Sequence, residues 1–330
     1  QWHNYGHSTI GARADVENVD IGRLQAFYRL YYQPDNATLI VSGKFDPARA
    51  LSLVQQHFGK IAKPKRELPK LYTIEAAQDG ERTVTLRRVG GTAQLMASYH
   101  GVPGAHPDQA AAELLTLVMG DTPAGRLHKR LTETNLAAQT SAYTPTLHDP
   151  GAMSFAASLA PGQDVAAAQA ALLATLEGVA KEPISVEELE RVRVKWLNGW
   201  DQLFTDPERI GVAVSEFVSQ GDWRLFFLLR DRVRSVKLAD VQRFGVERLL
   251  PANRTLGIYL PTDKPVRSPT PAVADLAQEM KSFVPQAAAA ASEKFEATPA
   301  NIDARTQRGR LAGNASGVQF ALLPKTTRGQ

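Results

Sequence analysis

The chain contains no cysteine among its 330 residues, so disulfide bonds, thiolate metal sites and a cysteine nucleophile are excluded for this sequence. No apolar run reaches the roughly eighteen residues that a membrane-spanning helix needs. The 38 basic and 34 acidic residues are spread along the chain, without a long run of like charge. This spread argues against nucleic acid or an anionic membrane as the principal partner. The length of 330 residues predicts roughly two domains, and the 43% hydrophobic content is that of an ordinary globular protein with buried cores.

Complete metal and nucleophile motifs are also missing. His3 and His7 are four residues apart, as two zinc ligands on one helix would be, but Gly6 stands where a hydrolytic motif has its general-base glutamate. This segment precedes the first region with helical spacing. We therefore interpret both histidines as surface or packing residues. A G-x-S-x-G nucleophile motif does not occur either.

The segment from Gly120 to Arg126 contains half of a phosphate-binding loop. Gly120 and Gly125 are separated by four residues, and a cation follows. The complete motif needs a lysine and then Ser or Thr, after a strand. Here Leu127 follows Arg126 and a predicted helix precedes the loop. We interpret the segment as a turn between two helices.

The most informative feature that the sequence does contain is an internal repeat. Residues 19–46 align without a gap with residues 236–263, and eight of the 28 positions are identical. An offset of 217 residues is much longer than a solenoid period, so it indicates two copies of a whole domain. If each copy lies near the end of its domain, the first domain has almost no chain before it. We therefore expect the sequence to begin in the middle of a domain.

The pattern of apolar residues predicts an α+β protein whose second domain has strands first and helices later. The expected strands cover residues 37–43, 82–88, 93–100, 138–146, 153–159 and 318–323, with another in the second repeat copy. The expected helices lie before Pro34 and at 46–59, 107–119, 126–133, 164–179, 185–204, after 206, in the second repeat copy and at 273–283. Ser185 and Glu188 have the spacing of a capping box that opens a long helix. On this helix Trp196, Trp200 and Phe204 share one face, which we interpret as core.

Several segments together resemble the pitrilysin/insulinase family of zinc peptidases, which includes the mitochondrial processing peptidase and core subunits of respiratory cytochrome bc complexes. The resemblance covers nearly the whole chain, which looks like a fragment of a bacterial two-half member. It is carried by WHNYGHSTIGARADVENVD at 2–20, a helix followed by PDNATLIVSG, GDTPAGRLHKRLTETNLA at 120–137, Leu189–Trp196, Gly221–Trp223 and the PANRTLGIYLP of the second repeat copy.

The resemblance implies homologous α+β domains, each with a mainly antiparallel sheet covered by helices on one face. Residues 1–70 would be the C-terminal part of a truncated first domain, and residues 71–263 a complete second domain. Residues 264–308 would link two halves, and residues 309–330 would begin a third domain. In such proteins the two halves close around an unfolded peptide.

The resemblance also implies where the chemistry lies. The family's inverted His-x-x-Glu-His motif and its distal glutamate ligand belong to the first domain, before the segment equivalent to Trp2–Gly11. We therefore expect no catalytic residue, no metal ligand and no zinc in this chain, and zinc in the parent protein. A loop that contacts peptide in some relatives matches Gly120, Gly125 and Arg126 in position, so these are the candidate substrate-binding residues.

The function implied for the parent protein is that of a zinc metalloendopeptidase acting on peptides or unfolded proteins. This chain would supply chamber wall and hinge, and would itself be inactive. Its expected partners are such a substrate and the remainder of its own chain. Self-association through exposed apolar surface, or through pairing of strand 318–323 with an open sheet edge, is also expected. The alternatives are a non-catalytic core or processing-type subunit, or a peptide-binding module of the same fold. The periplasm is the predicted location, with the cytoplasm as the alternative.

Overall fold

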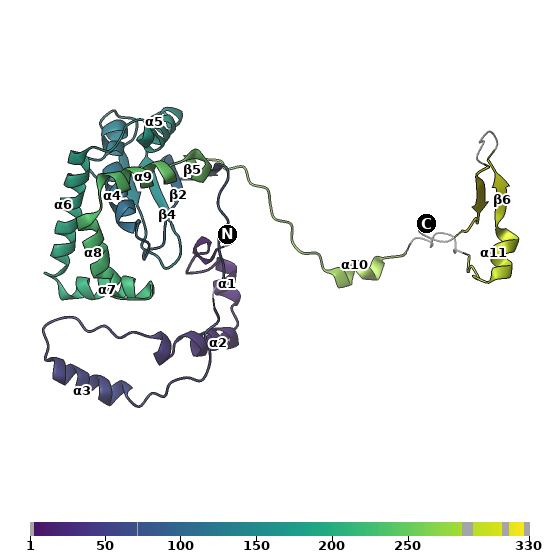
Figure 1. Ribbon diagram of the computed structural model, residues 1–330, viewed down its shortest axis with the longest axis horizontal. Helices are drawn as coiled ribbons and strands as arrows, with labels where there is room; N and C mark the ends of the chain where they lie inside the picture. The colour runs from purple at the N-terminus through teal and green to yellow at the C-terminus, as the bar shows by residue number, and fades with distance from the viewer. Residues whose placement is uncertain (1–2, 71, 286–292, 312–316, 327–330) are drawn as a thin grey trace. The chain divides into compact units, whose positions relative to one another are not determined.

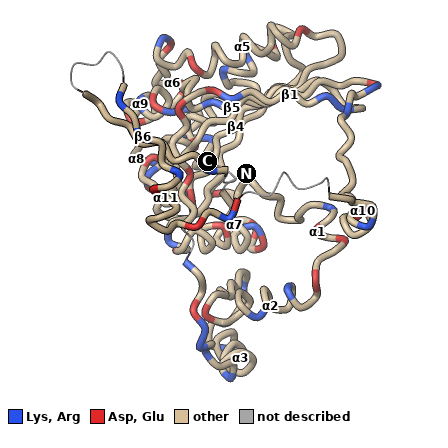
Figure 2. The backbone as a smooth tube through the Cα atoms, turned by 90° about the vertical axis from the view of Figure 1, so that its right-hand side faces the viewer, with Lys and Arg blue, Asp and Glu red and all other residues tan. Residues whose placement is uncertain are grey.

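The computed structural model describes residues 3–70, 72–285, 293–311 and 317–326. The chain divides into two compact units between Val266 and Arg267. In the described chain, the buried hydrophobic residues all lie between Leu95 and Leu256 of the larger unit. Figure 2 shows Lys and Arg interspersed with Asp and Glu along the backbone, as the spread of charge in the sequence predicts.

A five-stranded sheet with the order β1-β5-β2-β4-β3 forms the centre of the larger unit (Figure 1). The strands β1 and β5 run parallel, whereas the other three neighbouring pairs are antiparallel. The α+β class with a mainly antiparallel sheet is therefore confirmed. The strands are β1 (Arg82–Arg88), β2 (Gln94–His100), β3 (Gln139–Tyr143), β4 (Ala152–Ser158) and β5 (Arg254–Pro261).

Alternation of side chains separates the two faces of this sheet. In β2, Leu95, Ala97 and Tyr99 are fully buried, whereas Met96 between them is exposed. The register places Ala97 opposite Phe155 of β4, which is also fully buried. Because successive side chains of a strand point to opposite faces, one face carries the core and the other is open. The predicted covering of one face by helices is thus confirmed.

Helix α4 (Gln109–Gly120) is the centre of the helical layer. Its sequence is apolar on most sides, and it contacts α6, α8, α9 and β3. A helix that is apolar all round is stable only where neighbours cover it on all sides. The other helical elements of this layer are η3 (His128–Thr132), α5 (Val165–Glu177), η4 (Gly178–Ala180), α6 (Val186–Leu203), α7 (Pro207–Ser219), α8 (Leu225–Ser235), α9 (Leu238–Arg248) and η5 (Pro251–Asn253).

Helix α6 begins with the capping box that the sequence predicts. The Ser185 hydroxyl accepts a hydrogen bond from the Glu188 backbone N–H at 3.1 Å, and the Glu188 carboxylate accepts one from the Ser185 N–H at 2.9 Å. Two N–H groups at the start of the helix are therefore satisfied reciprocally. Helix α8 was not expected, although its Phe226 and Val233 are part of the core.

A buried polar cluster joins three elements of the core. The Tyr99 hydroxyl of β2 donates to Glu177 Oε1 of α5 at 3.0 Å, and the guanidinium of Arg254 in β5 bonds the same carboxylate. Burial, together with the charge of Glu177, raises the pKa of Tyr99, so the hydroxyl stays protonated. The cluster fixes the first residue of β5 against α5.

The segment before the sheet has helices, but none of its described residues is buried. Its elements are η1 (Asn4–Gly6), α1 (Arg13–Asn18), α2 (Ile21–Tyr31), η2 (Pro34–Asn36) and α3 (Pro47–Phe58). The strand predicted at residues 37–43 is wrong, because the segment has no ladder partner in the described chain. A side-chain hydrogen bond from Ser42 Oγ to the Pro207 carbonyl, 2.6 Å long, holds it beside α7 instead.

The smaller unit contains α10 (Leu276–Ser282), α11 (Pro299–Arg305) and an antiparallel pair, β6 (Gln307–Arg310) and β7 (Gln319–Leu322). The strand predicted at 318–323 is confirmed and has β6 as its partner, whereas its predicted pairing with an open edge of another sheet stays a prediction. The interpretation of residues 264–308 as an extended linker missed α11, which Thr298 caps and Pro299 opens. The alanine run at 287–290 lies outside the described residues.

Candidate functional site

Of the three candidate substrate-binding residues, Gly120 is the last residue of α4, and Gly125 and Arg126 lie between α4 and η3. Arg126 donates from Nε and Nη2 to the two carboxylate oxygens of Glu188, both at 2.7 Å. It also donates to the carbonyls of Glu182 and Pro183, at 2.7 and 2.8 Å. Burial acts to raise the pKa of Glu188, but the hydrogen bonds from Arg126 and the Ser185 N–H, together with the nearby arginine charges, outweigh burial, and the pKa is lowered. Arg126 thus ties the loop to the start of α6, and its contact with peptide stays a prediction.

Each of the two loop glycines has a packing reason. A Cβ atom on Gly120 would lie 2.1 Å from the Cβ of Ala142, where the end of α4 meets β3. A Cβ atom on Gly125 would lie 2.4 Å from the carbonyl oxygen of Asp121. Only glycine fits such close backbone approaches. The structure therefore brings all three predicted residues together in one rigid turn.

The histidine pair near the N-terminus does not form a shared metal site. His3 Nδ1 accepts from the Tyr5 N–H at 3.2 Å, and its Nε2 lies 3.4 Å from Asp149 Oδ2. His148 also bonds Asp149, at 2.9 Å. Over residues 3–70, 72–285, 293–311 and 317–326, no group of three or more His, Asp or Glu side chains has the arrangement needed to hold a metal ion. The described residues therefore do not fit zinc.

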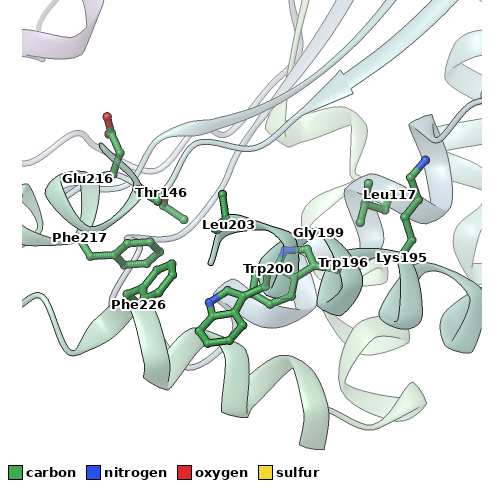
Figure 3. Close-up of a pocket in the computed structure, with 11 residues that line it drawn as sticks. Leu117, Thr146, Lys195, Trp196, Gly199, Trp200, Leu203, Glu216, Phe217 and Phe226 are labelled. Carbon is green, nitrogen blue, oxygen red and sulfur yellow. The ribbon is translucent and has the colours of Figure 1, made fainter. Parts of the chain in front are cut away.

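A cavity of about 450 Å³ lies among α4, α6, α7 and α8 (Figure 3). Aromatic side chains from three helices converge on it, and Figure 3 shows Phe217 and Phe226 side by side. The ring centroids of these two residues are 5.5 Å apart, and Phe226 stacks on Trp200 at 5.1 Å. The lining comprises Leu117, Thr146, Lys195, Trp196, Gly199, Trp200, Leu203, Ala213, Glu216, Phe217 and Phe226. We call this cavity the aromatic pocket.

The aromatic pocket arises from the face of α6 that the sequence predicts to be core. Trp200 is core, with 8% of its surface exposed, whereas Phe204, one turn later, is exposed. The guanidinium of Arg230 in α8 lies 4.7 Å from the centroid of the Trp200 ring, a cation–π contact. One α6 face therefore forms both core and cavity wall, because α7 does not cover it completely.

The two indoles of the aromatic pocket differ in their hydrogen bonds. Trp196 donates to the carboxyl group of Glu113 in α4. Trp200 Nε1 is buried and has no partner among the described residues. Burial raises the pKa of Glu113 to about 7, against the hydrogen bonds from Gln109 and Trp196 that lower it. An ionisable group that changes charge near neutral pH thus supports one wall of the cavity.

The charges at the edge of the aromatic pocket are unequally paired. The ammonium group of Lys195 bonds Asp121, a carboxylate that is largely buried. The carboxylate of Glu216 forms no ion pair in the part of the chain that the structure describes. The edge therefore presents one free negative charge, above an apolar interior.

A second and more polar cavity, of about 570 Å³, lies where β2 ends beside residues 73–78. His100 Nε2 is 3.4 Å from Glu75 Oε2, and its Nδ1 is 3.1 Å from Asn253 Oδ1. Gln78 holds the segment in place by donating to the Arg254 carbonyl at 2.7 Å. A hydrolytic triad needs a nucleophile hydrogen-bonded to the imidazole. His100 has none among the described residues, so we assign this cavity no chemistry.

Comparison with known families gives one match. The family described as the peptidase M16 inactive domain matches residues 18–195, more than half of the chain. The zinc protease PqqE of Helicobacter pylori is 25% identical over 249 residues, which cover 74% of this chain and 56% of that protein. The chain therefore spans about half the length of this relative.

Solved structures agree with this match. A protein described as an inactive peptidase domain, from Bordetella parapertussis, is 47% identical, with a TM-score of 0.50. The alignment covers 56% of this chain and 99% of that one. The first half of the periplasmic protease PqqL from Escherichia coli has a TM-score of 0.61 at 17% identity, with 77% of this chain and 57% of that one covered. At that identity the likeness shows the fold alone.

Proposed function

The chain belongs to the peptidase M16 inactive-domain family, and from this premise we propose that it is the non-catalytic domain of a zinc metalloendopeptidase acting on peptides or unfolded proteins. The observation that carries the proposal is the match over residues 18–195. The loop geometry is consistent with it, because Arg126 serves to fix α6. In this proposal the chain supplies wall and hinge of a substrate chamber.

The proposed domain organisation follows the internal repeat. Residues 1–70 would end a first peptidase-like domain, and residues 71–263 would form a complete second domain. Residues 264–308 would connect to a third domain beginning at 309–330. This is supported by the second repeat copy, which forms α9 and β5 of the core. The exposed apolar face of the first copy would be covered by the remainder of the same polypeptide, or by self-association when that is lacking.

Zinc would belong to the parent protein and not to this chain. In zinc peptidases the metal lowers the pKa of a bound water and polarises the peptide carbonyl. The chain's own contribution would be to shape and close the chamber that excludes bulk water. The periplasm is the proposed location, supported by the described compartment of the E. coli relative. Among the described residues, no helix is long and apolar enough to cross a membrane.

A cleavage and metal-binding assay tests this proposal. Purified chain would be incubated with zinc and an unfolded protein such as reduced casein, with and without a chelator. We expect no chelator-sensitive cleavage, no stoichiometric zinc after dialysis, and no zinc-dependent rise in Tm. Zinc-dependent cleavage at defined bonds by the chain alone would overturn the non-catalytic assignment.

The same assay on the longest natural polypeptide that contains this chain separates the rival readings. Chelator-sensitive cleavage by that polypeptide supports a peptidase with an inactive domain. Absence of cleavage, with binding of the unfolded protein retained, supports a non-catalytic subunit or a peptide-binding module.

A further inference from the structure

We propose that the aromatic pocket between α6, α7 and α8 binds one large apolar side chain of an extended peptide, with aromatic side chains preferred. The inference deepens the proposed function and rests on it, because unfolded polypeptide is the substrate class proposed there. It concerns binding by this chain's own residues and involves no metal.

The size and lining of the pocket define the class of ligand. A volume of about 450 Å³ is within the range of roughly 300–1,000 Å³ that small-ligand sites occupy. Two indoles and two phenyl rings, from Trp196, Trp200, Phe217 and Phe226, form its walls. Aromatic rings pack favourably edge-to-face or offset on such walls. An aromatic side chain therefore gains more contact here than an aliphatic one of similar size.

The buried indole N–H of Trp200 distinguishes a peptide from a hydrocarbon. Trp200 is more than nine-tenths buried, and its Nε1 has no acceptor among the described residues. Buried donors in native proteins are nearly always paired. A peptide that inserts a side chain brings backbone carbonyls with it, and one of them could accept this N–H if the Trp200 ring turns, because Nε1 itself has almost no accessible surface in the free chain. A lipid tail offers no acceptor at that depth.

The edge of the pocket selects the neighbouring residue of the peptide. Lys195 is neutralised by Asp121, whereas the Glu216 carboxylate is without an ion-pair partner in the described chain. A cation beside the inserted ring would meet this free negative charge. The favoured peptide therefore has Lys or Arg next to an aromatic residue.

Gly199 provides a way to fill the pocket without disturbing the fold. It lines the cavity within α6, and a Cβ atom added there meets no atom within 4 Å. Gly199→Leu therefore places a side chain at the cavity and also raises helix propensity. Val194→Leu, on an exposed position of the same helix outside the lining, is the matched control.

The test measures peptide binding to the full chain by calorimetry and by tryptophan fluorescence, in the presence of a chelator. The probes are an acetylated peptide amide of sequence Gly-Lys-Phe-Gly and the same peptide with Ala in place of Phe. We expect the chain and its Val194→Leu variant to bind the Phe peptide about tenfold more tightly than the Ala peptide. The Gly199→Leu variant is expected to lose this preference. Trp200→Phe, which keeps a ring and removes the N–H, is expected to weaken binding severalfold.

Equal affinity for the two peptides, or a Phe preference that survives in folded Gly199→Leu, would overturn this inference. Circular dichroism and Tm of each variant show that it is folded. A Glu216→Gln variant that binds Gly-Lys-Phe-Gly as tightly as the unmodified chain would refute the assignment of the edge charge. Failure here is distinct from failure of the proposed function, because that function is overturned by cleavage and this inference by loss of selective binding.

Discussion

The two copies of the internal repeat have related sequences and opposite surroundings. In the second copy Phe244 is fully buried and Leu256 is 2% exposed, whereas their counterparts Phe27 and Leu39 are 55% and 56% exposed. Helix α9 of the second copy packs on α4, and β5 pairs with β1 and β2. In the first copy α2 is a helix, but the segment after it is not a strand.

The difference between the two copies shows which elements are determined by their own segment of sequence and which need a partner elsewhere in the chain. A helix makes its hydrogen bonds within its own segment, so both copies form one after an equivalent start. A strand makes its hydrogen bonds to a neighbour, so the same sequence pattern gives a strand only where a sheet is present. In the proposed domain organisation, the apolar face of α2 is the surface that a sheet would cover.

The largest expected effect compares the two phenylalanines directly. Phe244→Ala should lower the free energy of unfolding by about 4 kcal/mol, because it leaves a cavity beside α4. Phe27→Ala should change it by less than about 0.5 kcal/mol, because its ring is mainly in solvent. Chemical denaturation of both variants gives the two values. A loss of similar size in Phe27→Ala would show that the first copy is packed in solution.

The helix on which the second copy packs contains a pH-sensitive group. Glu113 of α4 has a pKa of about 7 in the folded chain, above its ordinary value of 4.5. The fold therefore favours the protonated form, so the contribution of Glu113 to stability is highest below pH 4.5, decreases as pH rises, and levels off above about 7. Over this range the free energy of unfolding contributed by Glu113 decreases by about 3 kcal/mol.

Denaturation between pH 4.5 and 8 measures this slope. A Glu113→Gln variant should lose this part of the pH dependence, because it has no proton to release. Glu247→Gln, at an exposed position of α9, is the control and should leave the slope unchanged. If Glu113→Gln had the same pH dependence of stability as the unmodified chain, the assignment of this dependence to Glu113 would be refuted.

The ion pair at the start of β5 has no equivalent in the first copy, where Ala37 stands at the position of Arg254. Glu177→Gln should destabilise the chain by about 2 kcal/mol, since it leaves the mostly buried Arg254 charge without its partner. Thermal unfolding of Glu177→Gln, of Arg254→Met and of the double variant measures this loss of stability. If the double variant is as unstable as the sum of the single ones, the two side chains are not coupled.

The smallest effect on stability, and a direct test of the exposed copy, comes from Phe27→Glu. We expect the chain to self-associate through the apolar face of α2, and this substitution to weaken association about tenfold with little change in Tm. Light scattering over a concentration series measures it, with Val246→Glu in α9 as control. A monodisperse chain that does not bind a hydrophobic dye would contradict the expectation.

The sequence was sufficient for elements whose signals are local. The capping box of Ser185 and Glu188, the alternation in β2 and the helix-strand order of the second copy are all present in short windows. It was insufficient where a distant partner decides. Residues 37–43 have a strand pattern but no ladder partner among the described residues, and β7 pairs with β6, whose first two residues lie in the segment interpreted as a linker.

The candidate site shows the same limit. Gly120, Gly125 and Arg126 could be placed in one loop from their spacing, but the partners of Arg126 lie about sixty residues away in sequence. The stripe of Trp196 and Trp200 was visible on α6. That it borders a cavity depends on phenylalanines of α7 and α8, and the packing of these consecutive helices against one another cannot be inferred from the residue spacing within any one of them.

One carboxylate, that of Glu188, closes the capping box of α6 and also receives the guanidinium of Arg126. The turn after α4 and the first turn of α6 therefore cannot move separately without exposing an unpaired charge. About two and three turns further along the same helix are the indoles of Trp196 and Trp200 in the aromatic pocket. A peptide or neighbouring domain that displaced the turn would therefore also displace the start of α6, the helix that carries these indoles.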